Sequence, residues 1–244
     1  EADTFTAGIV YEPEWFDGFS MTIDYYKIEI DNAIASVNEQ YIVDQCLATT
    51  ANADSVLCQS ANIGMDSTGR ISFNNQLQNV GAEETSGVDL NLSYSFEAAG
   101  LNWKAGLDTT YLDEYVVTVL DDTVDYAGLI TSNIGGYADL KSNFTLNAAG
   151  DNWDAQYQAR YISGMDSYSC IGKDTCYAPS TPTVIYHDIS GSYMINETVA
   201  LSAGVNNLFD KQPPYYTGNN DSNTDPYTYD VLGRRFFAGV NVKF

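Results

Sequence analysis

The sequence predicts an all-β chain that crosses a membrane as the strands of an antiparallel barrel. Three observations lead to this fold class. Apolar residues recur at every second position in segment after segment, and the turns between those segments alternate between short and long. No apolar run approaches the roughly 18 residues that a membrane-spanning helix needs, so a chain of this kind would cross a membrane only as strands.

The final stretch, from Arg235 to Phe244, has the clearest alternation. Its apolar residues are Phe236, Ala238, Val240 and Val242, and polar or small residues stand between them. A period of two indicates a strand with one apolar face, which could belong to a soluble sandwich or to a membrane barrel. A large aromatic residue at the very end, Phe244, favours the barrel, because the termini of soluble domains usually fray.

The same alternation predicts nine strands in total. We expect them at residues 3–11, 19–30, 70–96, 102–120, 136–148, 153–161, 183–195, 198–208 and 227–244. The turns near residues 12–18, 97–101, 149–152 and 196–197 are short. The connections near residues 32–69, 121–132, 165–182 and 210–226 are long, with helical turns expected between residues 35 and 47. Outer-membrane barrels have this arrangement, with short periplasmic turns and long extracellular loops.

The charges and cysteines agree with a surface-exposed membrane protein. The chain has 33 acidic and 10 basic residues, a net charge of −23 that argues against binding nucleic acid. Charged strand residues such as Lys104, Asp108, Lys141 and Arg160 fall on the polar parity and would face a lumen. Cys46 with Cys58 and Cys170 with Cys176 form two local pairs in long loops, and we expect two disulfides rather than metal thiolates.

Two segments carry a family resemblance. N-N-L-F-D-K-Q-P-P-Y-Y at 206–216, followed by Gly233-Arg234 and the terminal Phe244, resembles the C-terminus of TonB-dependent outer-membrane receptors. L-Q-N-V-G-A-E-E-T-S-G-V-D-L at 77–90 is similar to a strand pattern of the same family. The resemblance implies a 22-stranded barrel closed by an N-terminal plug domain. Residues 1–244 would then be its C-terminal part, with the last nine strands and without the plug, the TonB box or the first barrel strands.

An odd strand count supports that expectation, because bacterial single-chain barrels have even numbers of strands. The chain begins at Glu1 without a signal peptide, so we expect a mature, trimmed or partial sequence.

Motifs for catalysis are few, and we expect no enzyme activity, no cofactor and no metal. His187 lies on an apolar strand parity, where a packed or interfacial role is more common than a catalytic one. The sequence D-S-N-T-D at 221–225 has the alternate-oxygen spacing of a calcium loop but has Pro226 and Leu232 where such a loop needs Gly and Glu.

Tyrosines in the long loops are candidates for binding a ligand, with packing between loops as the alternative. Aromatic residues near strand ends are explained by contact with lipid headgroups, but no lipid surrounds the long loops. The candidates are Tyr168, Tyr177, Tyr215, Tyr216, Tyr227 and Tyr229. Disulfides in the same loops would hold them ready for binding or protect them from proteases.

The expected function, implied by the resemblance, is active import of a scarce, bulky solute across the outer membrane. The solute would be a siderophore, a cobalamin-like molecule or an oligosaccharide. The partners of the receptor would be outer-membrane lipid and the TonB complex, which acts through the missing plug. Three alternatives stay open: a passive porin, an outer-membrane enzyme and a soluble β-sandwich adhesin.

Overall fold

A computed structural model of the chain describes residues 1–37, 39–47, 58–59, 63–65, 67–72, 77–132, 135–217 and 223–243. By the density of their internal contacts, the residues divide into two units. Unit 1 comprises Glu1–Thr4, Ile28–Thr85 and Tyr115–Asp125, and unit 2 comprises Phe5–Lys27, Ser86–Glu114 and Tyr126–Phe244. No helix among the described residues is long and apolar enough to cross a membrane.

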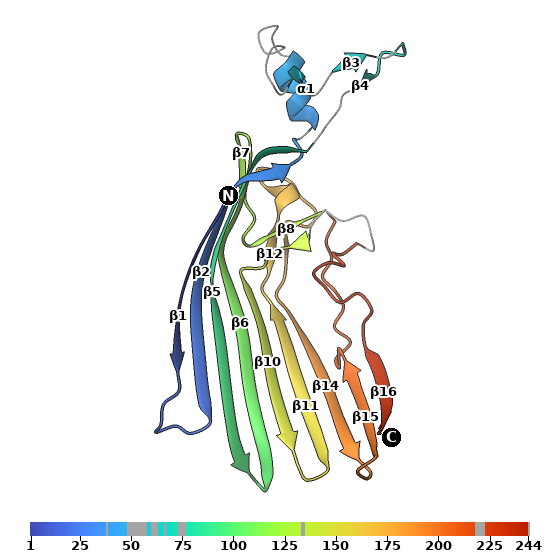
Figure 1. Cartoon of the computed structure of the whole chain (residues 1–244). Helices are drawn as coiled ribbons and strands as arrows, with labels where there is room; N and C mark the ends of the chain where they lie inside the picture. The colour runs from blue at the N-terminus through green and yellow to red at the C-terminus, as the bar shows by residue number, and fades with distance from the viewer. Residues whose placement is uncertain are drawn as a thin grey trace. The chain divides into compact units, whose positions relative to one another are not determined.

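One large sheet contains most of the described strands (Figure 1). Its order follows the sequence. The strands are β1 (Ala2–Tyr11), β2 (Phe19–Ala35), β5 (Gln78–Ala98), β6 (Leu101–Val119), β10 (Leu140–Ala149), β11 (Trp153–Ile162), β14 (Val184–Met194), β15 (Val199–Asn206) and β16 (Arg235–Val242), and β7 (Asp122–Asp125) pairs with β6. Strands of this sheet that follow one another in the chain are therefore also neighbours in the sheet, as in the wall of an up-and-down barrel.

The register of the antiparallel pairs sorts the side chains onto two faces. Tyr157 of β11 is opposite Ile189, Ile189 is opposite Val205, and Val205 is opposite Phe236. One position along, Gln158 is opposite Asp188. Because directly opposed residues share a face, apolar side chains form one face of the sheet and polar side chains form the other. The alternation in the sequence predicted this division.

Short turns join the strands at one end of the sheet. Between β5 and β6 only Ala99 and Gly100 intervene, both with positive φ (55° and 75°), the conformation of a tight two-residue hairpin. Between β14 and β15, the Oδ1 atom of Asn196 accepts hydrogen bonds from the N–H groups of Thr198 and Val199, both at 2.9 Å. These connections leave no room for a binding loop at this end.

The long connections contain structure of their own. In unit 1, helix α1 (Glu39–Leu47) precedes the small pair β3 (Gly64–Met65) and β4 (Ile71–Ser72). Val37, Ile42 and the Cys46–Cys58 disulfide form a small core there. In unit 2, a four-stranded sheet has the order β13 (Ser180–Thr181), β12 (Met165–Ser167), β8 (Leu129–Thr131) and β9 (Gly135–Gly136), with a 3₁₀ turn η1 at Tyr168–Cys170.

Several predicted boundaries were wrong, each at the long-loop end. The last strand begins at Arg235 rather than at residue 227, because Tyr227 and Tyr229 belong to the preceding loop. Strand β10 begins at Leu140 rather than at residue 136, since Gly135 and Gly136 pair instead with β8. Strand β2 continues to Ala35, past the expected end at residue 30.

We expect Val240→Arg to destabilise the folded protein in a membrane by about 1 kcal/mol or more, because it would place an arginine against lipid, where the cost rises to about 2 to 4 kcal/mol at mid-bilayer. Val240 lies on the apolar face of β16 and is 66% exposed. The measurement is reversible urea unfolding in lipid vesicles. Asn241→Arg, one position along on the polar face, is the matched control and should cost little. Equal effects at both positions would contradict the assignment of the faces.

Candidate functional site

The polar face of the sheet has a ladder of side-chain hydrogen bonds between neighbouring strands. Thr110 donates to Asp89 at 2.6 Å, and the Asn91 amide donates to Asp108. On the next strands, Gln158 Nε2 donates to Asn143 Oδ1 at 2.6 Å. Such groups need water or polar partners beside them, so this face is suited to an aqueous lumen rather than to lipid.

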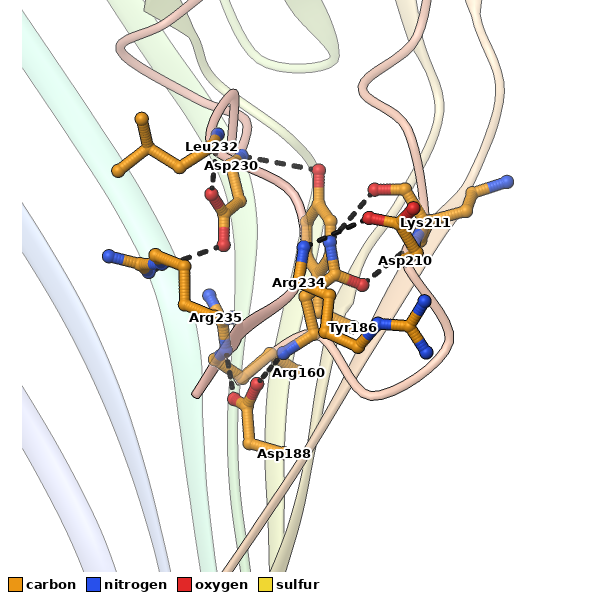
Figure 2. A network of polar contacts seen from close by, with 10 residues as sticks. Arg160, Tyr186, Asp188, Asp210, Lys211, Asp230, Leu232, Arg234 and Arg235 are labelled. Carbon is orange, nitrogen blue, oxygen red and sulfur yellow. Dashed lines mark hydrogen bonds and ion pairs between the residues drawn. The ribbon is translucent and has the colours of Figure 1, made fainter. Parts of the chain in front are cut away.

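The ladder ends in a denser network where β11, β14 and β15 reach the long loops (Figure 2). Arg160 Nε donates to Asp188 Oδ2 at 2.9 Å, and its guanidinium carbon lies 5.1 Å from the centre of the Tyr186 ring. The second oxygen of Asp188 accepts the backbone N–H of Asn207 at 2.7 Å. A single carboxylate therefore joins two strands to the first residue of the last loop, and its charge is paired with Arg160.

The residues that carried the family resemblance form a lock between the two ends of the last loop. The Asn207 side chain donates to the Lys211 carbonyl at 2.9 Å and accepts the Lys211 N–H at 2.8 Å. Asp210 Oδ1 accepts the N–H of Arg234 at 2.9 Å. Gly233 has a φ of 67°, and a Cβ atom there would stand only 2.8 Å from the same Asp210 oxygen. The glycine is therefore required both by its backbone conformation and by the approach of the carboxylate.

Beyond the lock, the loops of unit 2 have a core of their own. Its members are the buried side chains Ile130, Ala138, Met165, Val184, Tyr186, Tyr216 and Tyr229. The Tyr216 hydroxyl donates to the Ile130 carbonyl at 3.1 Å, and the Tyr229 hydroxyl donates to Thr181 Oγ1 at 2.8 Å. Burial raises the pKa of both tyrosines above the usual value, so both stay neutral and act as hydrogen-bond donors. These long connections are thus packed rather than open.

The six tyrosines predicted as ligand contacts fall into two groups. Tyr216 and Tyr229 are buried in the loop core, and Tyr216 is 0% exposed. Tyr168, Tyr177, Tyr215 and Tyr227 are exposed, and Tyr177 reaches 98%. Contact between a ligand and these residues stays a prediction, and the exposed group is the part that a ligand can reach without opening the core.

Sequence reasoning missed Tyr126, an aromatic neighbour of Tyr168, and Tyr137, which neighbours Tyr126 in turn. The ring centre of Tyr126 lies 5.7 Å from that of Tyr168 and 5.9 Å from that of Tyr137. Tyr126 and Tyr137 flank β8 and β9, so the three rings gather where two loops meet. The only signal in the sequence was that both residues also fall near the predicted acidic loop.

The other predicted features are found in the described residues as follows. Both expected disulfides, Cys46–Cys58 and Cys170–Cys176, are formed. Phe236, Val240 and Val242 lie in β16 and are exposed, and Phe244 lies outside the described residues. His187 is on the apolar face, where its Nδ1 atom lies 2.6 Å from the Tyr157 hydroxyl oxygen and its ring meets Phe209 edge-on.

The expectations of no metal and no cofactor stay predictions. In the part of the chain that the structure describes, no group of three or more His, Cys, Asp and Glu side chains is placed to hold a metal ion. Asp221, the first residue of D-S-N-T-D, lies outside the described residues.

We expect Gly233→Ala to loosen the last loop by more than its backbone strain alone. A positive φ costs an alanine about 1 to 2 kcal/mol, and loss of the bond from Arg234 to Asp210 adds about 1 kcal/mol. Gly172 has a φ of 72°, and a Cβ atom there would have open space for 4 Å around it, so Gly172→Ala carries the strain without the clash and serves as the control. Hydrogen exchange of the Arg234 amide should rise more in the first variant. Equal rates in both would disprove the lock.

Comparison with known proteins agrees with this geometry. Residues 1–208 match the family described as TonB dependent receptor-like, beta-barrel. No curated protein sequence matches the chain. Solved structures with similar folds include a mutant of the ferric enterobactin receptor PfeA from Pseudomonas aeruginosa in complex with enterobactin, with 18% identity and a TM-score of 0.64. The copper transporter OprC has 18% identity and a TM-score of 0.58. The FrpB iron transporter from Neisseria meningitidis has 17% identity and a TM-score of 0.59.

The alignments cover this chain completely but the other proteins only in part. Each alignment covers 100% of this chain but 31% of the other one, so the chain spans about a third of the length of the receptors it resembles. At this level of identity the structures show the fold alone. The family match extends over most of the chain, and with the two-faced antiparallel sheet it establishes that this chain is an outer-membrane protein belonging to the family of TonB-dependent receptor β-barrels.

Proposed function

We propose that the receptor containing this chain imports a scarce, bulky solute across the outer membrane with energy supplied through TonB. The observation that carries the proposal is the continuous polar face of the sheet, which meets a packed, tyrosine-rich loop layer at the end opposite to the short turns. The loops would take up the solute outside the cell, and the polar face would line the route inward. The TonB complex would act through an N-terminal plug, as in other receptors of this kind.

A metal complex such as a ferric siderophore is the solute class that we place first, because of the proteins to which the chain is similar. The polar face of the sheet has both signs of charge, with Lys104 and Lys141 as well as Asp89 and Asp108, and Arg160 is paired with Asp188. With a net charge of −23 these residues do not attract a strongly anionic solute, so positive charge for such a complex would come from the rest of the receptor. The solved structures named above include receptors for ferric enterobactin and transporters for copper and iron. A cobalamin-like molecule and an oligosaccharide are the remaining classes.

Energy dependence separates import by a receptor from diffusion through a porin. The full-length receptor would be expressed in a Gram-negative strain that lacks its other receptors for iron complexes, with and without a functional TonB protein. We expect uptake of a radioactive ferric siderophore only in the strain with TonB. Equal uptake in both strains would identify a passive channel. If no siderophore enters either strain, labelled cobalamin and oligosaccharides are the next solutes to test.

Three exposed tyrosines provide a test of the capture surface. Tyr177, Tyr215 and Tyr227 have exposed side chains that contribute little to the loop core. We expect changing all three to alanine to weaken binding of the solute by about 10-fold or more, the usual effect of losing aromatic contacts in an interface. Binding to whole cells is the measurement. Tyr193→Ala, on the apolar face of β14, is the control. Unchanged affinity in the triple variant would assign these tyrosines to another role.

A further inference from the structure

The apolar face of the sheet has a groove across four neighbouring strands, β11, β14, β15 and β16 (Figure 1). Small residues form its floor, and each lies directly opposite the next in the order Ala155, Gly191, Ala203 and Ala238. Two adjoining hollows, of about 650 Å³ and 440 Å³, have Gly191 and Ala203 in common among their lining residues. The two hollows are therefore parts of one groove, which lies entirely within unit 2.

Larger side chains form the two rims of the groove. The rim toward the long loops consists of Tyr157, Ile189, Val205 and Phe236, and the rim toward the short turns consists of Trp153, Tyr193, Leu201 and Val240. Side chains on one face of a strand are two residues apart, so each rim is the row next to the floor. The floor thus lies between two rows of bulky apolar side chains on the face that meets lipid.

Contacts at both rims keep the groove open. The Tyr157 hydroxyl oxygen lies 2.6 Å from Nδ1 of His187, which is on β14 at the loop side of the residue opposite Tyr157. The Tyr157 ring therefore leans toward the loops rather than over Ala155. At the other rim the Trp153 ring lies over the turn, since a Cβ atom on Gly150 would stand 2.5 Å from Trp153 Nε1. This role also accounts for a polar pair of side chains on the lipid-facing side of the sheet.

The dimensions of the groove fit one hydrocarbon chain. Its floor crosses four strands, and a spacing of about 4.8 Å between strands makes it about 14 Å long. One leaflet supplies about half of the roughly 30 Å hydrocarbon core, which is a similar length. The rims are about 13 Å apart between Cα atoms, and their side chains narrow the opening further. A helix with a diameter of about 10–12 Å is too wide for the space that remains.

The direction of the groove also suits a lipid chain. Barrel strands are tilted by about 35–45° from the membrane normal, so a row of residues at right angles to them runs obliquely into the membrane. Ala148 and Trp103 continue the row beyond Ala155. Ala148 is next to the last residue of β10, at the short turns, whereas Ala238 lies four residues from the end of β16. The groove therefore starts near the periplasmic headgroups and goes deeper into the hydrocarbon toward β16.

We propose that this groove binds one acyl chain of a phospholipid from the periplasmic leaflet, with the headgroup beside Trp103 and the turn after β10. Tryptophan is common at that level of a membrane protein, where its ring meets the headgroups. The bound chain packs against the wall along the whole groove instead of exchanging freely with the surrounding lipid. Because the groove exists only in the folded sheet, the lipid stabilises this part of the wall. The inference depends on the lipid-facing side of the sheet and not on which solute is imported.

The test fills the groove with an aromatic ring. Ala203→Phe places the ring in the middle of the floor, and Ala105→Phe, on the apolar face of β6 opposite Leu146, is the matched control outside the groove. The full-length receptor is washed in detergent to remove loosely held lipid and is then titrated with palmitoyl-oleoyl phosphatidylethanolamine. Native mass spectrometry measures how tightly the first lipid binds.

We expect the first lipid to bind Ala203→Phe at least about 10-fold more weakly than the wild type, because the ring takes the place of several methylene groups of the chain. Ala105→Phe should bind this lipid as the wild type does. Equal affinities in the two variants, whether at the wild-type level or below it, would overturn the proposal.

A measurement on the wild type covers the case in which Ala203→Phe does not fold. The full-length receptor is placed in vesicles of the same phospholipid with a photoreactive diazirine in the middle of the acyl chain, and the labelled peptides are identified after illumination. We expect stronger labelling around Gly191, Ala203 and Ala238 than around Leu107 on the apolar face of β6. Equal labelling at all these positions would indicate ordinary surrounding lipid only and would also overturn the proposal.

Discussion

The structure depends on one constraint: in the hydrocarbon of a membrane, every backbone N–H and C=O group must find its partner within the protein. The antiparallel sheet meets this constraint strand by strand, and its register then decides which side chains face lipid. Tyr157, Ile189, Val205 and Phe236 lie in one row across four strands because each is directly opposite the next. A shift of one residue in any of these pairs would exchange the apolar and polar faces.

Where the strands leave the membrane, side chains rather than neighbouring strands satisfy the backbone groups. Asp188, Asn207 and Asp210 satisfy backbone groups of the chain as it enters and leaves the last loop. Above them, the loops are held by a core with buried tyrosines and by short strands of their own. A core of this kind holds the exposed aromatic side chains of the same loops in place. Under the proposed function, such a rigid surface would lose less entropy when a solute binds.

The alternation in the sequence predicted the long strands well because a strand between lipid and water has no other way to arrange its side chains. Strand β11 was expected at 153–161 and spans Trp153–Ile162. The loop sheet could not be predicted, since β8, β9, β12 and β13 are too short to show a period. Tyr227 and Tyr229 alternate as strand residues do, but the loop core holds Tyr229. Phe237 breaks the polar parity of β16, and only the structure shows its ring lying over Gly204. The lock depends on a contact between distant residues, Asp210 and Arg234, which no local pattern reveals.

The central claim is that the two faces of this sheet meet lipid and water. Single spin labels at successive positions of β11, from Ala155 to Arg160, would test it most directly in the full-length receptor in lipid vesicles. We expect a period of two in the accessibility of the labels. Oxygen dissolved in the lipid should reach labels at Ala155, Tyr157 and Ala159, and a water-soluble nickel chelate should reach labels at Gln156, Gln158 and Arg160. Accessibility without that alternation would contradict the barrel assignment and the transport function built on it.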